Sequence, residues 1–360
     1  MACSIMKTYK NLYIEIMSFE NLYLAYRQAR KGKRGKAPVA NFELNYEPNL
    51  LELQDELLSL TYKPGAYHNF TIYEPKQRLV SAAPFRDRVV HHALCRVIEP
   101  IWEARFIHHS YACRIGKGTH AAVAQAHHWV RQYPYVLHGD IVKYFPSIDH
   151  QILFSLISRR IKDPKVLWLI QSILDTGRGI QTQERPDLYF EGDDLFAILR
   201  PKGLPIGNLT SQFWANVYLH ELDRFAKQEL HCKAYLRYMD DFLLFSESKA
   251  QVNDWKLKIR DFLGSQLRLL LHEKKSVVVP TRVGLDFCGY LIFPEKRKIR
   301  RSSVTRFLKR YKLQRRLYKT GQLTLEKMRE SIQSWIAHAA HADSWRLRGQ
   351  IFRKYPLLSR

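Results

Sequence analysis

The chain has 360 residues, 46% of them hydrophobic, which excludes a largely disordered protein and allows two or three subdomains around a substantial core. Its formal net charge of +24 calls for an anionic partner, and nucleic acid is the first candidate. We find no run of about 18 apolar residues that could span a bilayer and no signal peptide. The five scattered cysteines favour reduced thiols over a disulfide framework or a zinc site. We therefore expect a cytoplasmic protein without membrane contact.

Hydrophobic patterning predicts the regular elements in chain order. Helices are expected over residues 47–60, 87–99, 119–132 and 207–229, a short strand over 135–141, and hairpins over 68–81, 234–246 and 283–293. An early basic run is either a solvated loop or a phosphate contact, and its members are Arg27, Arg30, Lys31, Lys33, Arg34 and Lys36. Residues 291–360 hold 19 Lys and Arg against 4 Asp and Glu, a net charge of +15, which predicts a separate basic helical module.

The tetrapeptide Tyr238-Met239-Asp240-Asp241 lies between two apolar β runs. Two acidic residues at a hairpin turn project a pair of carboxylates from a buried scaffold. Asp is also a favoured residue of ordinary turns, so an Asp-Asp pair alone is more often a solvated turn than a site. The context of two flanking buried strands makes this pair a candidate for catalysis.

Asp140 is the natural partner of that pair. It ends an apolar strand in the segment HGDIVKYFPSIDH, ahead of a helix that Ser147 or Asp149 could cap. Nucleotidyl transfer uses two divalent metals, one at the primer 3′-hydroxyl and one at the triphosphate. Because Mg²⁺ prefers oxygen ligands, the three carboxylates predict a two-metal polymerase site.

DIVKYFPSID followed by YMDD resembles the palm motifs of reverse transcriptases. The resemblance covers nearly the whole chain: KQRLVSAAPFRDRVVHHAL and HSYACRIGKGTHAAV resemble finger motifs of bacterial reverse transcriptases related to group II introns, and LHEKKSVVV and LDFCGYLIFP resemble the palm motifs that follow the hairpin. The fold implied is an α/β (α+β) right-hand polymerase. Its expected parts are an N-terminal segment and fingers over 1–139, a palm with an antiparallel sheet over 140–293, with a finger insertion around 160–200, and a basic helical thumb over 294–360.

The same resemblance implies roles for individual residues. Asp140, Asp240 and Asp241, with the backbone carbonyl of Ile141, would hold two Mg²⁺ ions, with Mn²⁺ as an alternative. Phe145 falls where these enzymes place an aromatic steric gate against the 2′-hydroxyl, although simple core packing also explains a phenylalanine there. The remaining residues implied in contacts with the dNTP are Arg78, Lys76, Ile206, Gly207 and Lys275, the last with Lys274 as an alternative register. Those implied in contacts with primer and template are Tyr238, Met239, Gly289, Tyr290 and Gln212.

The segment GLPIGNLTSQ, residues 203–212, discriminates among reverse transcriptases. Related enzymes generally read LPQGxxxSP, and here Ile206 replaces the Gln and Gln212 replaces the final Pro. The form IGNxxSQ resembles the enzymes of diversity-generating retroelements, which copy a template-repeat RNA with frequent errors at adenines. Isoleucine cannot hydrogen-bond, so it would leave the nucleotide pocket less discriminating. The alternative is that Ile206 is an ordinary core residue and fidelity is set elsewhere.

The subclass implies further partners. Diversity-generating enzymes are compact, and the resemblance implies a small basic accessory protein, itself oligomeric, together with template RNA, cDNA primer and dNTPs. A stand-alone or anti-phage defence reverse transcriptase is the alternative within the family. A non-catalytic RNA-binding protein on the same fold is a third hypothesis, and the intact Asp140, Asp240 and Asp241 argue against it.

Overall fold

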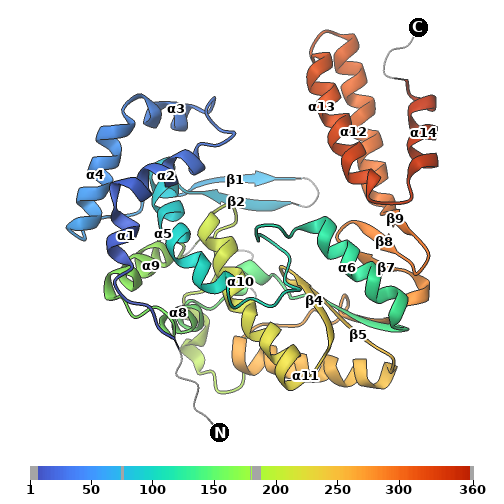
Figure 1. Cartoon of the computed structure of the whole chain (residues 1–360), viewed down its shortest axis with the longest axis horizontal. Coiled ribbons are helices and arrows are strands. Elements are labelled where there is room, and N and C mark those ends of the chain that lie inside the picture. The colour runs from blue at the N-terminus through green and yellow to red at the C-terminus, as the bar shows by residue number, and fades with distance from the viewer. Residues whose placement is uncertain (1–6, 74–76, 179, 181–187, 357–360) are drawn as a thin grey trace.

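The computed structural model describes residues 7–73, 77–178, 180 and 188–356. The N-terminal helices lie on one side of a central sheet, and three C-terminal helices stand apart on the other side (Figure 1). The first half contains α1 (Tyr13–Met17), α2 (Phe19–Ala29), α3 (Ala37–Leu44), α4 (Tyr46–Leu58), β1 (His68–Ile72), β2 (Arg78–Ala82), α5 (Phe85–Glu103), α6 (Thr119–Gln132), β3 (Tyr135–Gly139), α7 (Tyr144–Ser147), α8 (His150–Ser158) and α9 (Pro164–Thr176).

The second half begins with the short 3₁₀ helix η2 and includes a π-helical turn, η3. Its elements are η2 (Leu195–Leu199), α10 (Leu209–Arg224), η3 (Phe225–Glu229), β4 (Ala234–Tyr238), β5 (Asp241–Ser246), α11 (Lys249–Leu267), β6 (Val277–Pro280), η4 (Thr281–Val283), β7 (Leu285–Phe287), β8 (Tyr290–Ile292), β9 (Arg297–Ile299), α12 (Arg301–Lys319), α13 (Leu325–Ala340) and α14 (Trp345–Lys354). None of the helices within the described ranges is long and apolar enough to cross a membrane.

The central sheet is antiparallel in the order β4-β5-β3-β6. Successive residues of its strands face different cores: Val136 joins the cluster under α6, whereas Leu137 joins the large cluster with α10 and α11. Because side chains alternate across a strand and both faces are covered, the strands are apolar almost throughout. At the end of β3, Gly139 lets the ring of Phe242 on β5 pack closely, since a Cβ there would lie 2.2 Å from that ring.

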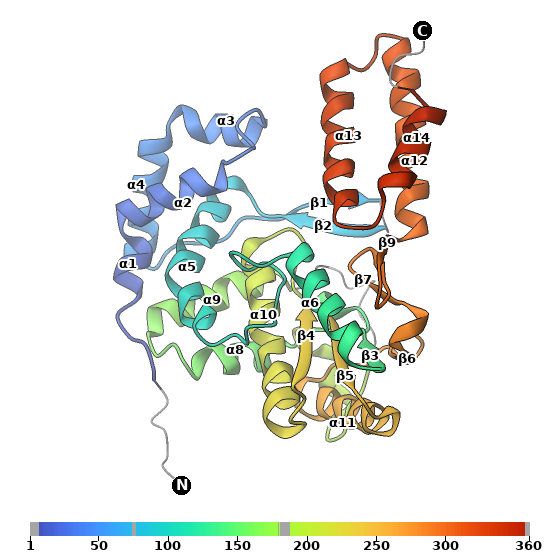
Figure 2. The same ribbon diagram turned by 45° about the vertical axis from the view of Figure 1, so that its right-hand side comes forward.

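The C-terminal helices α12, α13 and α14 have a core of their own, built around aromatic rings. Phe307 stacks on Trp335 with ring centroids 3.8 Å apart, and Tyr311 and Phe352 pack around them. A small sheet in the order β7-β8-β9 leads into these helices, as the turned view in Figure 2 shows. The Tyr290 hydroxyl on β8 lies 2.9 Å from His338 Nδ1 on α13, which ties the small sheet to the C-terminal helices.

The elements expected from hydrophobic patterning are largely confirmed. The helix over 119–132 is α6, the strand over 135–141 is β3, and the three hairpins are β1–β2, β4–β5 and β7–β8. The helix expected over 207–229 is divided, because α10 ends at Arg224 and a π-helical turn follows. Of the two candidate caps, Asp149 accepts from the amides of Gln151 and Ile152 at the start of α8, whereas Ser147 lies inside α7.

Candidate active site

The acidic tetrapeptide forms the turn of the β4–β5 hairpin. Tyr238 pairs with Asp241, so Met239 and Asp240 are the two turn residues. Met239 has a φ of 58°, a left-handed conformation that non-glycine residues adopt infrequently and at some cost. The turn therefore holds both carboxylates at the end of a sheet whose strands are buried on both faces.

A fully buried arginine stabilises this turn through hydrogen bonds. Arg237 is 0% exposed and forms a two-pronged ion pair with Asp223 of α10, at 2.7 Å for both N–O contacts. Its Nη1 also donates to the Met239 carbonyl at 3.0 Å and to Asn216 Oδ1 at 3.0 Å, and its Nη2 donates to Ser110 Oγ at 3.2 Å. The planar guanidinium thus fixes the backbone of the turn to α10 and to the loop before α6.

Asp140 follows β3, next to the hairpin turn. Its amide donates to Ser276 Oγ at 3.1 Å, and its carbonyl accepts from the amide of His272 at 2.8 Å. Lys275 Nζ lies 2.5 Å from Asp140 Oδ2. Of the two adjacent lysines, Lys275 is the one that forms an ion pair with Asp140.

Electrostatics show that the carboxylates lie near one another. Burial, followed by the nearby Asp241 and Asp140 charges, raises the pKa of Asp240 to about 6, while the Arg78 guanidinium acts in the opposite direction. His138 Nε2 on β3 lies 3.5 Å from Asp241 Oδ1. Mutual repulsion of carboxylates in a partly desolvated site disfavours full ionisation. A cation bound beside them would therefore stabilise their ionised forms.

The donor set suits Mg²⁺, because the carboxylates and the Ile141 carbonyl at this edge are all oxygen ligands. As the side chains stand, no three carboxylate, imidazole or thiol groups within the described ranges are gathered tightly enough to hold a metal ion. Asp140 is instead paired with the Lys275 ammonium, and Asp241 lies against His138. The cationic ammonium group of Lys275 thus lies against Asp140 in this structure.

The residues expected around the nucleotide come together through backbone hydrogen bonds. The amide of Ser81 on β2 donates to the Ile206 carbonyl at 2.9 Å, and the amide of Leu204 donates to the Phe145 carbonyl at 2.9 Å. Phe145 is half-buried, with its ring edge-on to Tyr144. The segment before α10 is thereby bonded to strand β2, whose first residue is Arg78, and to the short helix α7 that follows Asp140.

Gly207 has a local structural reason to be glycine. Its φ is +119°, and a Cβ at this position would lie 2.9 Å from Val80 Cγ1 on β2. Both the backbone conformation and the close approach of the hairpin therefore exclude a side chain. The Ile206-Gly207 peptide is consequently held against β2.

The other predicted site residues occupy different surroundings. Lys76 lies outside the described residues. Gln212 is exposed on α10, and the Tyr238 hydroxyl lies 2.9 Å from Thr119 Oγ1. Gly289, with a φ of +88°, is the turn of β7–β8 and faces His338, while Tyr290 is fully buried. Primer contacts at position 290 would therefore involve its backbone.

The sequence interpretation missed the support of the turn. Arg237 stands between apolar residues of a buried strand, and Asp223 lies on the buried face of α10. A charged residue inside an apolar run was the available signal, because such groups are rarely buried unless they are paired. His138, which faces Asp241, gave no signal in the sequence.

The antiparallel sheet, its covering helices and the acidic turn at its edge form the α/β architecture of a right-hand nucleic-acid polymerase. Residues 63–292, more than half of the chain, match the family model described as reverse transcriptase (RNA-dependent DNA polymerase). The chain therefore belongs to the reverse transcriptase family, and the expected fold class and enzyme class are confirmed.

The relatives include a group II intron-encoded protein. The group II intron-encoded protein LtrA of Lactococcus lactis is 23% identical over 364 residues, covering 82% of this chain and 58% of LtrA. Protein YkfC of Escherichia coli K12 is 26% identical over 285 residues, covering 68% of this chain and 71% of YkfC. Among solved structures, apo telomerase from Candida tropicalis aligns with a TM-score of 0.45 and 12% identity, covering 81% of this chain and 61% of that one.

Proposed function

We propose that this chain copies an RNA template into DNA with Asp140, Asp240 and Asp241 as its catalytic carboxylates. The observation that carries the proposal is the position of Asp240 and Asp241 at the β4–β5 turn beside Asp140, which follows the adjacent strand β3. The raised pKa of Asp240 agrees with this crowding of negative charge at one sheet edge. Two Mg²⁺ ions held by these residues and the Ile141 carbonyl would activate the primer 3′-hydroxyl and stabilise the triphosphate. The Arg237 network would keep the turn in register for them.

The nucleotide would enter between the β1–β2 hairpin and the sheet edge. Arg78 begins β2 near Asp240, so its guanidinium can contact a triphosphate. Lys275 would exchange Asp140 for a phosphate once a metal occupies that carboxylate. Phe145 would lie under the sugar and exclude a 2′-hydroxyl, and Lys76 and Gly207 would complete the pocket.

The test is primer extension on a defined RNA template with dNTPs and Mg²⁺. Asp241→Asn should abolish extension while the protein remains folded, and Asp261→Asn, an exposed aspartate of α11, should extend at the wild-type rate. Wild-type rates from folded Asp241→Asn protein would contradict the site. Phe145→Ala should raise ribonucleotide incorporation, and an unchanged dNTP preference would return Phe145 to core packing.

We propose the three-part division as well: fingers over 1–139, palm over 140–293 with an insertion around 160–200, and thumb over 294–360. The separate aromatic core of α12, α13 and α14 supports a distinct C-terminal unit. Gly289 and Tyr290 would place primer at the joint between palm and thumb, and Tyr238, Met239 and Gln212 would line the template–primer path.

Within the family, we propose that the enzyme serves a diversity-generating retroelement and makes adenine-directed errors with a small basic accessory protein. The sequence IGNLTSQ, with Ile206 in place of Gln, supports this subclass. The Ile206 carbonyl accepts a hydrogen bond from the amide of Ser81, and the isoleucine side chain offers no hydrogen-bonding group to a nucleotide. An A·dTTP pair has two Watson–Crick hydrogen bonds and would depend most on a geometric check that isoleucine cannot supply.

Sequencing of cDNA made from a defined RNA, with the accessory protein present, tests the subclass. Wild type should misincorporate more often opposite adenine than opposite guanine, and Ile206→Gln should reduce errors at adenine most. Equal accuracy at adenine and guanine in wild type would contradict the diversity-generating role. It would favour the stand-alone or defence enzyme, without affecting the assignment of the three aspartates.

A further inference from the structure

A basic hollow lies near the C-terminal end of α10, away from the carboxylates. Its walls come from the N-terminal segment, the end of α5, the end of α8 and the last turns of α10, and its volume is about 510 Å³. The basic side chains that line it are Lys7, Arg105, Arg159, Arg160 and Arg224. Glu221 is the carboxylate among the lining residues, so positive charge dominates the hollow.

The arginines of this hollow are largely without carboxylate partners. Arg224 lies 3.4 Å from Glu221, but no carboxylate in the described part of the chain lies within 4.0 Å of the side-chain nitrogens of Arg105, Arg159 or Arg160. The fully buried Arg237, by contrast, is paired with Asp223. Five basic side chains gathered around one hollow with a single carboxylate leave an excess of positive charge there, which favours an anionic ligand.

The cluster is held in place by the backbone. The amide of Tyr9 donates to the Arg160 carbonyl at 2.8 Å, and the amide of Lys162 donates to the Tyr9 carbonyl at 2.8 Å. This pairing fixes the N-terminal segment, with Lys7, beside the end of α8. Burial, followed by the charges of Arg105 and Arg224, lowers the pKa of Arg160, which shows that these three arginines are neighbours despite their mutual repulsion.

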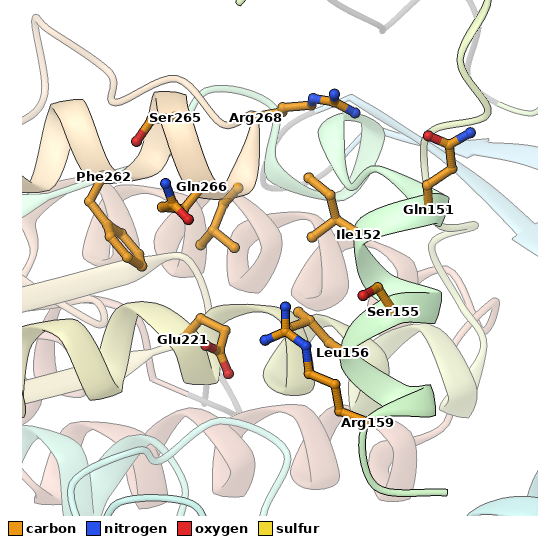
Figure 3. Close-up of a pocket in the computed structure, with 11 residues that line it drawn as sticks. Gln151, Ile152, Ser155, Leu156, Arg159, Glu221, Phe262, Ser265, Gln266 and Arg268 are labelled. Carbon is orange, nitrogen blue, oxygen red and sulfur yellow. The ribbon is translucent and has the colours of Figure 1, made fainter. Parts of the chain in front are cut away.

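A second hollow of about 400 Å³ continues the first between α8, α10 and α11. The two share Leu156, Arg159 and Glu221. Figure 3 shows Arg159 and Glu221 along one edge of the second hollow, with polar and apolar side chains on its other walls. These polar groups, which can donate to or accept from hydroxyls, are Gln151, Ser155, Ser265 and Gln266. The two hollows, here called the α8–α10 groove, thus join a basic end to an end that contains amide and hydroxyl side chains.

The groove is distinct from the active site. Leu209 begins α10 beside the nucleotide-pocket segment 203–207, whereas Arg224 ends it in the groove. At 1.5 Å per residue, the 16 residues of α10 place the basic hollow at Arg224 roughly 20 Å or more from the nucleotide-pocket segment. A template–primer duplex in the proposed channel would therefore leave the groove free.

We propose that the α8–α10 groove binds the backbone of a structured RNA outside the template–primer channel. Clustered arginines fit a run of phosphates, and the polar groups of the second hollow fit 2′-hydroxyls, the feature that distinguishes RNA from DNA. A basic accessory protein would be repelled by this surface. The inference rests on the proposed function only in taking RNA as the polymer that the protein handles.

The experiment measures binding of the full chain to a labelled, blunt-ended stem-loop RNA, with a DNA of the same sequence in parallel. The triple variant Arg105→Gln, Arg159→Gln, Arg160→Gln removes three charges and retains hydrogen-bonding side chains. Lys249→Gln, Lys258→Gln, Arg260→Gln on the exposed face of α11 is the matched control. The groove variant should bind RNA at least about tenfold more weakly, and its salt slope should fall by about 2 to 3, since each neutralised phosphate contributes about 0.9.

Extension of a short primer–template by the groove variant should remain within about twofold of wild type, as expected for substitutions away from the chemistry. An unchanged RNA affinity and slope would overturn the proposal and leave the groove to an acidic protein surface. An equal loss in the α11 control, an equal loss for DNA, or a parallel loss of short-template extension would also overturn it. Because binding is measured without synthesis, an inactive wild type would contradict the proposed function and leave this test intact.

Discussion

Asp240→Asn should make the protein more stable and catalytically inactive at the same time. The substitution removes one charge from a half-buried site that already contains Asp140 and Asp241, and it keeps the shape of the side chain. Burial and like charge destabilise the ionised Asp240, and asparagine relieves that cost. The same charge is the one we propose to bind metal, so stability and activity should change in opposite directions.

The magnitude follows from the pKa of Asp240, which rises from 3.8 to about 6 on folding. Because the folded-state pKa is the higher one, the carboxyl contributes stability below the unfolded pKa and loses it as pH rises through about 6. One pKa unit corresponds to about 1.4 kcal/mol, so the loss above pH 6 is at most about 3 kcal/mol. Asparagine does not titrate, so the variant should gain up to that amount at about pH 8 and little below about pH 4.

The assay is urea unfolding of wild type and Asp240→Asn without divalent metal, at acidic and at alkaline pH. Adding Mg²⁺ should stabilise wild type more than the variant and narrow the gap between them. Primer extension should fall at least about 100-fold, since even outer-shell changes at metal sites cost 10- to 100-fold. Equal stability of the two proteins at alkaline pH would refute the crowding of negative charge at this edge. A gap that Mg²⁺ leaves unchanged would refute metal binding by Asp240.

Other parts of the site give further predictions. Arg237→Met should destabilise the protein by about 3–5 kcal/mol in urea unfolding, because Asp223 is left buried and unpaired; a loss below about 1 kcal/mol would contradict that pairing. Gly207→Ala should raise the KM for dNTPs, because the added Cβ would clash with Val80 of β2 beside the nucleotide pocket. An unchanged KM would mean that the Ile206-Gly207 peptide does not contribute to that pocket. A further variant replaces the basic residues of α12 by neutral ones at Arg306, Lys309, Arg310, Arg315 and Arg316. Its salt slope of template–primer binding should fall by about one unit for each phosphate that is no longer neutralised. A wild-type slope would mean that these residues do not bind nucleic acid.

The acidic tetrapeptide shows how far local sequence could predict the site. Two apolar runs around an acidic pair predict a hairpin with carboxylates at its turn, and Asp140 at another strand end predicts a partner. The strand order β4-β5-β3-β6 makes these strands neighbours. It depends on the pairing of β3 with β5, which are about a hundred residues apart in the chain. Local periodicity carries no information on such pairing, because a strand's pattern specifies its faces and not its neighbour.

The two adjacent lysines illustrate the same limit at the level of one side chain. The sequence places Lys274 and Lys275 equally well, and the bridge that joins Ile141 to Leu271 sets the register that brings Lys275 to Asp140. Arg237 was visible only as a charge in an apolar run. Its partner Asp223 lies on a different element, and only the packing of α10 against the sheet brings the two together.

The sequence by itself predicted the regular elements, the family and the acidic residues that we propose for the chemistry, because these depend on short-range periodicity and on motifs contiguous in the chain. Tertiary structure alone decided the raised pKa of Asp240, the buried support of the turn and the α8–α10 groove. Each of these depends on charges from separate elements meeting in a partly desolvated space, where burial and neighbouring charge set the energy of every ionised group. The arginines at 105, 159, 160 and 224 are scattered in the chain and become one surface only when α5, α8 and α10 pack together.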